Sequence, residues 1–257
     1  MTHKKKRKVI LHGHMFKNAG SSVDKLLLDN FGKDFVDHRD NLNMQQGKQT
    51  YLIKFLEKNK NIKSLSSHHL PLPLDPVSEI ELLIIIFLRH PIVRVGSVYR
   101  FEKIQNSETP GSMAARKYSF QDYIRWRLDN RPIVISNYFV NYCTSTLPVD
   151  TSLKDRFNST LHFTKHTGLT GIVEYFDSSM CLIRKKLENR GIKFITKSTR
   201  INITDALNEP LEEKLSKLQT DLGSALYDEI VEANSYDLSL YNTFVERYLL
   251  SQNSHSV

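Results

Sequence analysis

The run Leu82–Leu88 constrains the fold more than any other stretch of this sequence. It reads Leu-Leu-Ile-Ile-Ile-Phe-Leu, without a single polar residue. Such a run is typical of a central parallel strand that is buried on both faces. Because parallel strands are joined by crossover helices, the run predicts an α/β fold with a central parallel sheet flanked by helices. The length of 257 residues suits one domain of this kind, which we place at residues 9–250.

The stretch Val9–Ser22 predicts a strand, a loop and the start of a helix. An apolar run at its beginning predicts the strand, and the loop that follows contains Lys17 and Gly20. After Ser22, apolar residues recur at the spacing of a helix that should stop near Gly32, at Val23, Leu26, Leu27 and Phe31.

This loop has the properties of a phosphate-binding site. Gly20 would let the backbone approach a ligand closely, and Ser21 or Ser22 would cap the helix. The first N–H groups of the helix, with the positive end of the helix dipole behind them, attract an anion. The order of residues differs from that of the nucleoside-triphosphate loop, in which Lys follows the second Gly. The same residues would also fit an ordinary strand-to-helix turn with a solvated Lys17.

A pair of histidines follows a second predicted strand. Residues 62–66 predict this short strand, and it leads into a loop that contains His68, His69 and Pro71. A histidine that a strand delivers to the neighbourhood of a phosphate site is a candidate general base.

The strand at Leu82–Leu88 is followed by Arg89-His90-Pro91. Pro91 predicts the first turn of a helix, so Ser97 lies about two turns further on. Ligands of open α/β sheets bind at the carboxyl ends of the strands, which makes Arg89 and Ser97 candidate anion-binding residues. An enzyme of magnesium nucleotides often has Asp at such a strand end. Arg89 therefore disfavours a kinase or an ATPase.

The remaining segments are assigned from the same patterns. Residues 102–116 contain Pro110 and Gly111 and predict a loop, and a polar basic loop is expected around Arg200. Leucines at helical spacing between residues 211 and 226 are expected to pack on the sheet. Further helices are predicted around 51–56, at 120–128, 133–147 and 177–190, and from 209 to 250, with further strands at 171–173 and 193–195.

The charge and composition narrow the class of protein. The chain has 36 Lys and Arg against 28 Asp and Glu, a net charge of +8, which favours an anionic cofactor or substrate. Residues 1–8 are interpreted as a solvated basic lead-in and residues 251–257 as a disordered tail. The longest apolar run is far shorter than the ~20 residues of a membrane span. Two cysteines without a CxxC pair fit a reducing cytoplasm, where we place the protein.

Two motifs resemble those of carbohydrate sulfotransferases. Residues 16–22, Phe-Lys-Asn-Ala-Gly-Ser-Ser, resemble the loop Pro-Lys-x-Ala/Gly-Gly-Thr-Ser that holds the 5′-phosphosulfate of 3′-phosphoadenosine 5′-phosphosulfate (PAPS). Residues 89–99 resemble the 3′-phosphate motif, Arg-Asp-Pro-x-x-Arg-x-x-Ser-x-Tyr. The segments His69-Leu70-Pro71 and 171–177 are similar to two further segments of the family. The branch that looks nearest contains the heparan sulfate 2-O-sulfotransferases and uronyl sulfotransferases.

The resemblance implies a P-loop-like, three-layer α/β/α sulfotransferase fold. It also implies transfer of a sulfuryl group from PAPS to a hydroxyl acceptor, which we expect to be a carbohydrate. His69 would be the general base and Lys17 would stabilise the leaving phosphate. We expect no metal and no nucleic-acid partner. The residues implied to bind PAPS are Lys17, Asn18, Ala19, Gly20, Ser21, Ser22, Arg89, Ser97 and Arg200.

The chain departs from the family pattern at four positions. Phe16 replaces the usual Pro, Ser21 the usual Thr, and His90 the usual Asp. His68 stands where a Gly commonly precedes the base, which leaves His68 as the alternative to His69.

Two other functions stay open at this point. One is an ATP-dependent kinase of the P-loop type, which the position of Lys17 in its loop and the presence of Arg89 disfavour. The other is a basic domain that binds polyanions without catalysis, which gives no reason for Lys17 and His69 to lie at one edge of the sheet. The sequence does not indicate an oligomeric state.

Overall fold

The computed structural model describes residues 6–167, 169–196 and 209–253. The chain divides into two compact units, of which the first comprises residues 1–88 and 142–202 and the second residues 89–141 and 203–257. The single domain at residues 9–250 stays a prediction.

The first unit contains the strands and the helices that cover them. Two single turns of 3₁₀ helix, at Gly32–Asp34 and Val173–Tyr175, belong to it as well. Its main elements are β1 (Arg7–Gly13), α1 (Gly20–Phe31), β2 (Phe35–His38), α2 (Asn41–Lys58), β3 (Ser64–Ser67), β4 (Ile80–Leu88), α7 (Leu153–Thr167), β5 (Thr170–Ile172) and α8 (Phe176–Glu188).

The described strands form a five-stranded sheet in the order β2-β3-β1-β4-β5, and every neighbouring pair is parallel. β4 is the predicted central strand, and residues 83–88 of it are buried. The register pairs Gly13 at the end of β1 with Ser67 at the end of β3. Because parallel strands point the same way, the segments that follow β1 and β3 lie at the same edge of the sheet.

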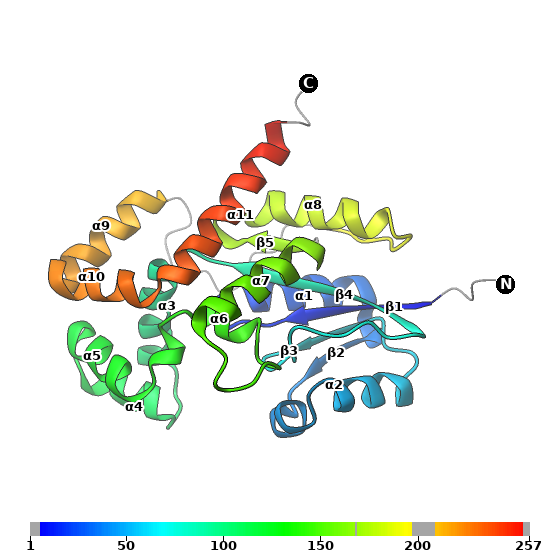
Figure 1. Ribbon diagram of the computed structural model, residues 1–257, viewed down its shortest axis with the longest axis horizontal. Coiled ribbons are helices and arrows are strands. Elements are labelled where there is room, and N and C mark those ends of the chain that lie inside the picture. Colours follow the sequence, from blue (N-terminus) through cyan, green and yellow to red (C-terminus); the bar gives the residue numbers. More distant parts are fainter. Residues whose placement is uncertain (1–5, 168, 197–208, 254–257) are drawn as a thin grey trace. The chain divides into compact units, whose positions relative to one another are not determined.

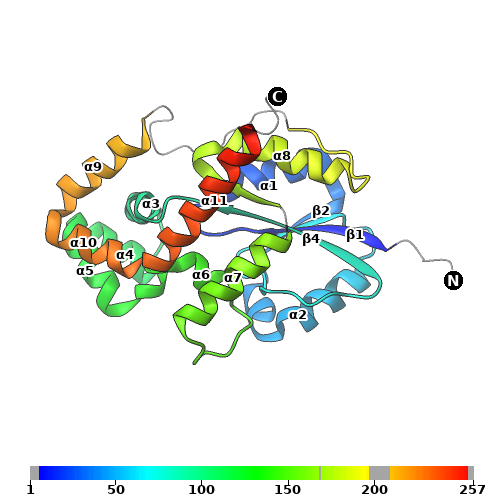
Figure 2. The same ribbon diagram turned by 45° about the horizontal axis from the view of Figure 1, so that its top comes forward.

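Helices cover both faces of this sheet, as the three-layer prediction requires. Figure 1 and Figure 2 show α1 and α8 on one face and α2 and α7 on the other. Right-handed crossovers put α1 and α2 on opposite faces, because the chain crosses the sheet in opposite directions from β1 to β2 and from β2 to β3. The core under α1 and α8 includes Ile10, Val23, Leu27, Leu83, Ile85, Phe87, Met180, Ile183 and Leu187.

The second unit is helical in the part that the structure describes. Helix α6 (Tyr138–Tyr142) belongs to this unit except for its last residue, Tyr142, which belongs to the first unit. A turn of 3₁₀ helix lies at Pro132–Val134. No helix among the described residues is long and apolar enough to cross a bilayer. The helices are α3 (Pro91–Ile104), α4 (Pro110–Lys117), α5 (Phe120–Asn130), α6 (Tyr138–Tyr142), α9 (Leu211–Leu222), α10 (Ser224–Ala233) and α11 (Ser235–Asn253).

Two sequence-based strand assignments differ from the structure. β2 was missed, because its four residues include Asp37 and His38 and lie in a polar stretch. The strand predicted at 193–195 is wrong. Asn30 of α1 replaces a neighbouring strand there, since its Nδ2 donates to the Ile195 carbonyl (2.9 Å) and its Oδ1 accepts from the Ile195 N–H (2.7 Å).

Several helix assignments differ too. The loop predicted at 102–116 is wrong, because α3 continues to Ile104 and Pro110 begins α4 behind the capping residue Thr109. The helix predicted at 133–147 is interrupted at Asn137, whose φ of 43° is left-handed. α11 continues to Asn253, past the predicted end at 250, and residues 254–257 lie outside the described residues.

The leucines of α9 were predicted to pack on the sheet, whereas the contact that the structure shows within the second unit is with another helix. Leu218 packs on α3, where a side chain added at Gly96 would meet its methyl group at 2.7 Å. Apolar spacing identifies a buried helix face but not the partner of that face, because any apolar surface satisfies the pattern. α8 begins at Phe176 after Tyr175, so Asp177 lies in its first turn rather than at its cap.

In the second unit, the starts of α6 and α11 cap each other. Asp237 is almost fully buried, and its carboxylate accepts from the N–H groups of Phe139 (2.8 Å) and Val140 (3.0 Å). In return, Asn137 Oδ1 accepts from the N–H groups of Tyr236 and Asp237, both at 3.1 Å. Burial raises the pKa of Asp237 to about 6, although these hydrogen bonds oppose the shift.

We expect Asp237→Ala to lower the free energy of unfolding by about 2–4 kcal/mol, because two buried N–H groups lose their acceptors. Urea denaturation followed by circular dichroism measures this. Asp228→Ala on α10 removes an exposed carboxylate and should stay within about 0.5 kcal/mol of the unchanged protein. Equal losses in the two variants would contradict the role of Asp237.

Candidate active site

The segment between β1 and α1 is a tight turn, Met15–Ala19, which we call the phosphate turn. Lys17 and Ala19 both have left-handed backbone conformations, with φ of 64° and 59°. Left-handed conformations are costly for residues other than glycine, so the surroundings must hold them. Asn18 supplies part of that hold. Its buried side chain donates from Nδ2 to the carbonyl of Phe87 on β4 (2.7 Å), and its N–H donates to Met15 (3.2 Å).

Helix α1 begins directly after the phosphate turn. Ala19 is its N-cap residue, and no side chain caps it, so the prediction that Ser21 or Ser22 caps the helix is wrong. The helix starts at Gly20, before either serine, and the N–H groups of Ser22 and Val23 donate to the Ala19 carbonyl. The first N–H groups of a helix have no acceptor within it, and they provide the partial positive charge of an anion site.

Gly20 is required by its neighbour His14. A Cβ atom added at Gly20 would lie 2.2 Å from both Cδ2 and Nε2 of His14. The imidazole edge of His14 therefore occupies the space that a side chain at Gly20 would need. This contact places a histidine nitrogen at the first residue of α1, beside the phosphate turn.

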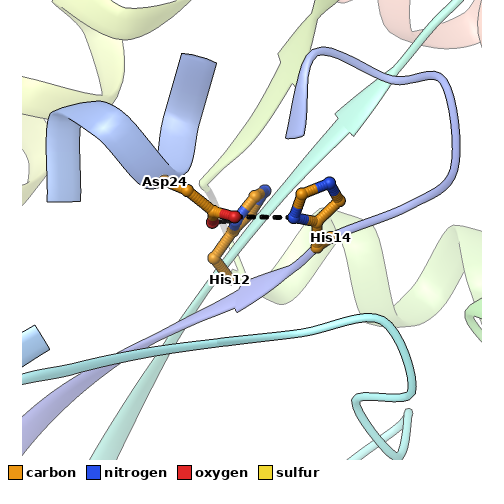
Figure 3. A group of neighbouring side chains, drawn as sticks. All are labelled: His12, His14 and Asp24. Carbon is orange, nitrogen blue, oxygen red and sulfur yellow. Dashed lines mark hydrogen bonds and ion pairs between the residues drawn. The ribbon is translucent and has the colours of Figure 1, made fainter. Parts of the chain in front are cut away.

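Beneath the turn, one carboxylate joins two histidines (Figure 3). Nδ1 of His12 lies 2.7 Å from Oδ1 of Asp24, and Nδ1 of His14 lies 2.7 Å from Oδ2 of the same side chain. His12 Nδ1 also lies 3.0 Å from the hydroxyl of Ser66, its register partner on β3. Arg39 approaches Asp24 at 3.8 Å. We call His12, Asp24 and His14 the His-Asp-His cluster.

The distances in this cluster are those of hydrogen bonds. Its three side chains offer ligand atoms within 4.8 Å of one another, as a metal site would. Two ligands at ~2.0–2.1 Å from one tetrahedral Zn²⁺ are, however, about 3.3 Å apart, well above the 2.7 Å between each Nδ1 and its carboxylate oxygen. We therefore interpret both Nδ1 atoms as N–H donors to Asp24.

The cluster keeps Asp24 ionised. Burial alone would raise the pKa of Asp24, but the hydrogen bonds from His12 and His14 outweigh burial and hold this pKa well below its usual range. Burial lowers the pKa of His12, against the opposing effect of Asp24, so His12 is neutral at neutral pH.

The histidine pair after β3 lies at the same edge. The His14 N–H donates to the Ser67 carbonyl (2.9 Å), and His68 Nδ1 donates to the His14 carbonyl (2.8 Å). The rings of His14 and His68 lie 4.2 Å apart between centroids. Burial lowers the pKa of His68 to about 4, and the neighbouring His14 contributes to this shift. His69 is exposed, and partial burial lowers its pKa below the ordinary value.

In the second unit, the sequence-predicted residues flank the start of α3. Arg89 follows the last residue of β4, and His90 is the N-cap residue of the helix. Burial lowers the pKa of His90 to about 4, and its ring packs edge-on against Tyr241. Ser97 is fully buried, and its hydroxyl has no hydrogen-bond partner among the described residues. A buried hydroxyl without a partner requires an explanation, and a bound ligand is one.

The structure thus brings together one part of the predicted site. The phosphate turn, Gly20 and the pair His68–His69 lie at one edge of the sheet in the first unit. Arg89 and Ser97 belong to the second unit. Arg200 lies outside the described residues.

Sequence reasoning missed Asp24 as the shared partner of His12 and His14. A signal was present, because Ile10, His12 and His14 alternate and so continue the strand face that packs under α1. Asp24 follows Val23 on the buried side of the same helix. A carboxylate there must meet polar partners, since an unpaired buried charge is costly.

Comparison with known proteins identifies the family of the chain. Residues 3–244 match the sulfotransferase family. An uncharacterized protein of Archaeoglobus fulgidus is 31% identical to this chain over 248 residues, which cover 94% of this chain and 98% of the relative. Because the family match spans nearly the whole chain, from β1 into α11, the chain belongs to the sulfotransferase family.

Proposed function

We propose that this protein transfers a sulfuryl group from PAPS to a hydroxyl group of a carbohydrate. One observation carries the proposal: the pairing of β1 with β3 brings a histidine pair to the phosphate turn. Such an arrangement provides an anion site and a base side by side. The choice of PAPS and of a carbohydrate acceptor rests on the resemblance of residues 16–22 and 89–99 to carbohydrate sulfotransferase motifs.

The residues present fit the donor. Lys17, Gly20 and the first N–H groups of α1 would hold its 5′-phosphosulfate, and Asn18 keeps the phosphate turn in shape. Arg89 and the Ser97 hydroxyl would hold the 3′-phosphate, since a guanidinium with a hydroxyl suits phosphate geometry. When bound, PAPS supplies a sulfuryl group on a phosphate leaving group. As the bond from sulfur to the bridging oxygen breaks, Lys17 would stabilise the charge on that oxygen.

We propose His69 as the general base. The acceptor hydroxyl must reach the base, and the imidazole of His69 is exposed whereas that of His68 is half-buried. A base works best when its pKa is near the working pH, and the pKa of about 4 makes His68 a weak one. His69 would take the proton of the acceptor hydroxyl as the new oxygen–sulfur bond forms. His68, tied to the His14 carbonyl, would support the loop.

We further propose a reducing, cytoplasmic environment. The support is that Cys143 is buried and Cys181 exposed, and both are free thiols.

We expect adenosine 3′,5′-bisphosphate, the product left by PAPS, to raise the melting temperature. A ligand held only by the native state stabilises it by mass action. ATP with magnesium should shift the temperature much less, because Arg89 stands where a kinase would place an acidic metal ligand. Differential scanning fluorimetry with both nucleotides compares them, and a larger shift with magnesium ATP would favour a kinase.

We expect Arg89→Ala to weaken binding of adenosine 3′,5′-bisphosphate by roughly 1.5–3 kcal/mol, the contribution of a charge-assisted hydrogen bond. Isothermal titration calorimetry measures this. Arg125→Ala on α5 removes an exposed positive charge and serves as the control. Equal dissociation constants for Arg89→Ala and the unchanged protein would refute the 3′-phosphate assignment.

We expect His69→Ala to retain nucleotide binding but to lower turnover by ~10²–10⁴-fold, the contribution of a positioned base. The base must be deprotonated, so the wild-type rate should rise with pH through the pKa of His69, which lies below the ordinary value. That rising limb should vanish in the variant. Assays with PAPS and a panel of carbohydrates measure both effects. A large loss in His68→Ala, with His69→Ala near normal, would move the base to His68.

A further inference from the structure

The His-Asp-His cluster is not used by the proposed reaction, yet it lies against the site of the proposed anion. Its carboxylate is ionised, and two imidazoles donate to it. A carboxylate so engaged fixes both rings and their tautomers, as second-shell carboxylates do for functional histidines. The Nδ1 atom of each ring faces Asp24, so any further role falls to the Nε2 atoms.

The two histidines differ in what they face. His12 is 1% exposed, lies on β1 and has Ser66 as its second neighbour, so it is enclosed within the protein. His14 lies one residue beyond β1, and its Nε2 edge covers Gly20, where α1 begins. Only His14 thus presents a ring nitrogen to the phosphate turn.

We propose that His14 is a second phosphosulfate-binding cation, that it takes up a proton when the donor binds, and that Asp24 is its positioning residue. This inference rests on the proposed function. Nδ1 of His14 keeps its proton toward Asp24, so Nε2 can donate to an anion only after it gains a proton from solvent. An anion at the phosphate turn on one side and the carboxylate of Asp24 on the other favour the charged imidazole.

The charges around His14 partly oppose and partly favour a proton on its ring. Arg39 opposes a positive charge on His14, while Asp24 supports it directly and Asp37 holds Arg39 in an ion pair of 2.7 Å. A bound nucleotide with several negative charges would favour the protonated imidazole of His14. The titratable and charged groups around His14 come from four elements and the phosphate turn: His12 of β1, Asp24 of α1, Asp37 and Arg39 at the end of β2, His68 after β3, and Lys17.

Calorimetry with adenosine 3′,5′-bisphosphate tests the inference. Titrations at pH 7 in two buffers of different ionisation enthalpy give the number of protons taken up on binding. We expect greater uptake in the wild type than in His14→Gln, and roughly tenfold to hundredfold weaker binding in that variant. The nucleotide is the same in both, so the difference isolates the contribution of the protein.

Asp24→Asn separates positioning from a merely structural role. It keeps the shape of the side chain but removes the charge, so proton uptake should fall toward that of His14→Gln while the melting temperature changes little. If His14→Gln does not fold, Asp24→Asn provides the comparison. His162→Gln, which alters an exposed histidine on α7, should match the wild type in both quantities.

The outcomes are distinguishable. Binding without extra proton uptake in the wild type would overturn the role of His14 and leave the proposed function intact. Failure of the wild type to bind the nucleotide at all would overturn the proposed function, and this inference with it. Equal uptake in the wild type, His14→Gln and Asp24→Asn would assign the proton to the nucleotide or to another histidine.

Discussion

The candidate site depends on the hydrogen-bonded position of β1 between β3 and β4. β1 is paired with β4 from Arg7 to His12 and with β3 from Ile10 to Gly13, so its second half is held by both neighbours nearly to its end. From that end the chain enters the phosphate turn, which Asn18 then ties to the Phe87 carbonyl of β4. Left-handed backbone at Lys17 and Ala19 is stable only in such a frame, because no isolated turn of this sequence would adopt it. The shape of the proposed anion site therefore depends on the pairing of the strands.

The same pairing explains which parts were predictable from sequence. The unbroken apolar run around Ile85 predicted β4, because a strand that is buried on both faces is apolar at successive positions. The helical spacing of apolar residues after Gly20 predicted α1, because a helix that is buried on one side is apolar along that side. The sequence of β2 has no such apolar pattern, because an edge strand of four residues can be half polar. The leucines of α9 show the limit of periodicity, because the pattern identifies a buried face and not its partner.

At the candidate site, the sequence suggested individual residues but not which of them are hydrogen-bonded to one another. Motif and position made Lys17, Gly20 and His69 candidate site residues, whereas Asp24 was missed, because a single carboxylate in an apolar helix face has no local pattern. Its partners come from a strand and the residue beyond it, and only the packing of α1 on β1 brings them together. The order His12, His14 and then Asp24 becomes informative once the strand alternation is combined with the helix period.

The charge states of the histidines bear on the proposed anion site. Burial keeps His12 and His68 neutral at neutral pH, so these rings add no fixed positive charge at the turn. In the proposed site, permanent attraction for an anion would come from Lys17 and the start of α1, both of which act at any physiological pH. A charge that His14 gained only with the ligand, as we propose, would not face Arg39 in the empty protein. Asp24 would favour such a charge, because its carboxylate is ionised and lies 2.7 Å from Nδ1 of His14.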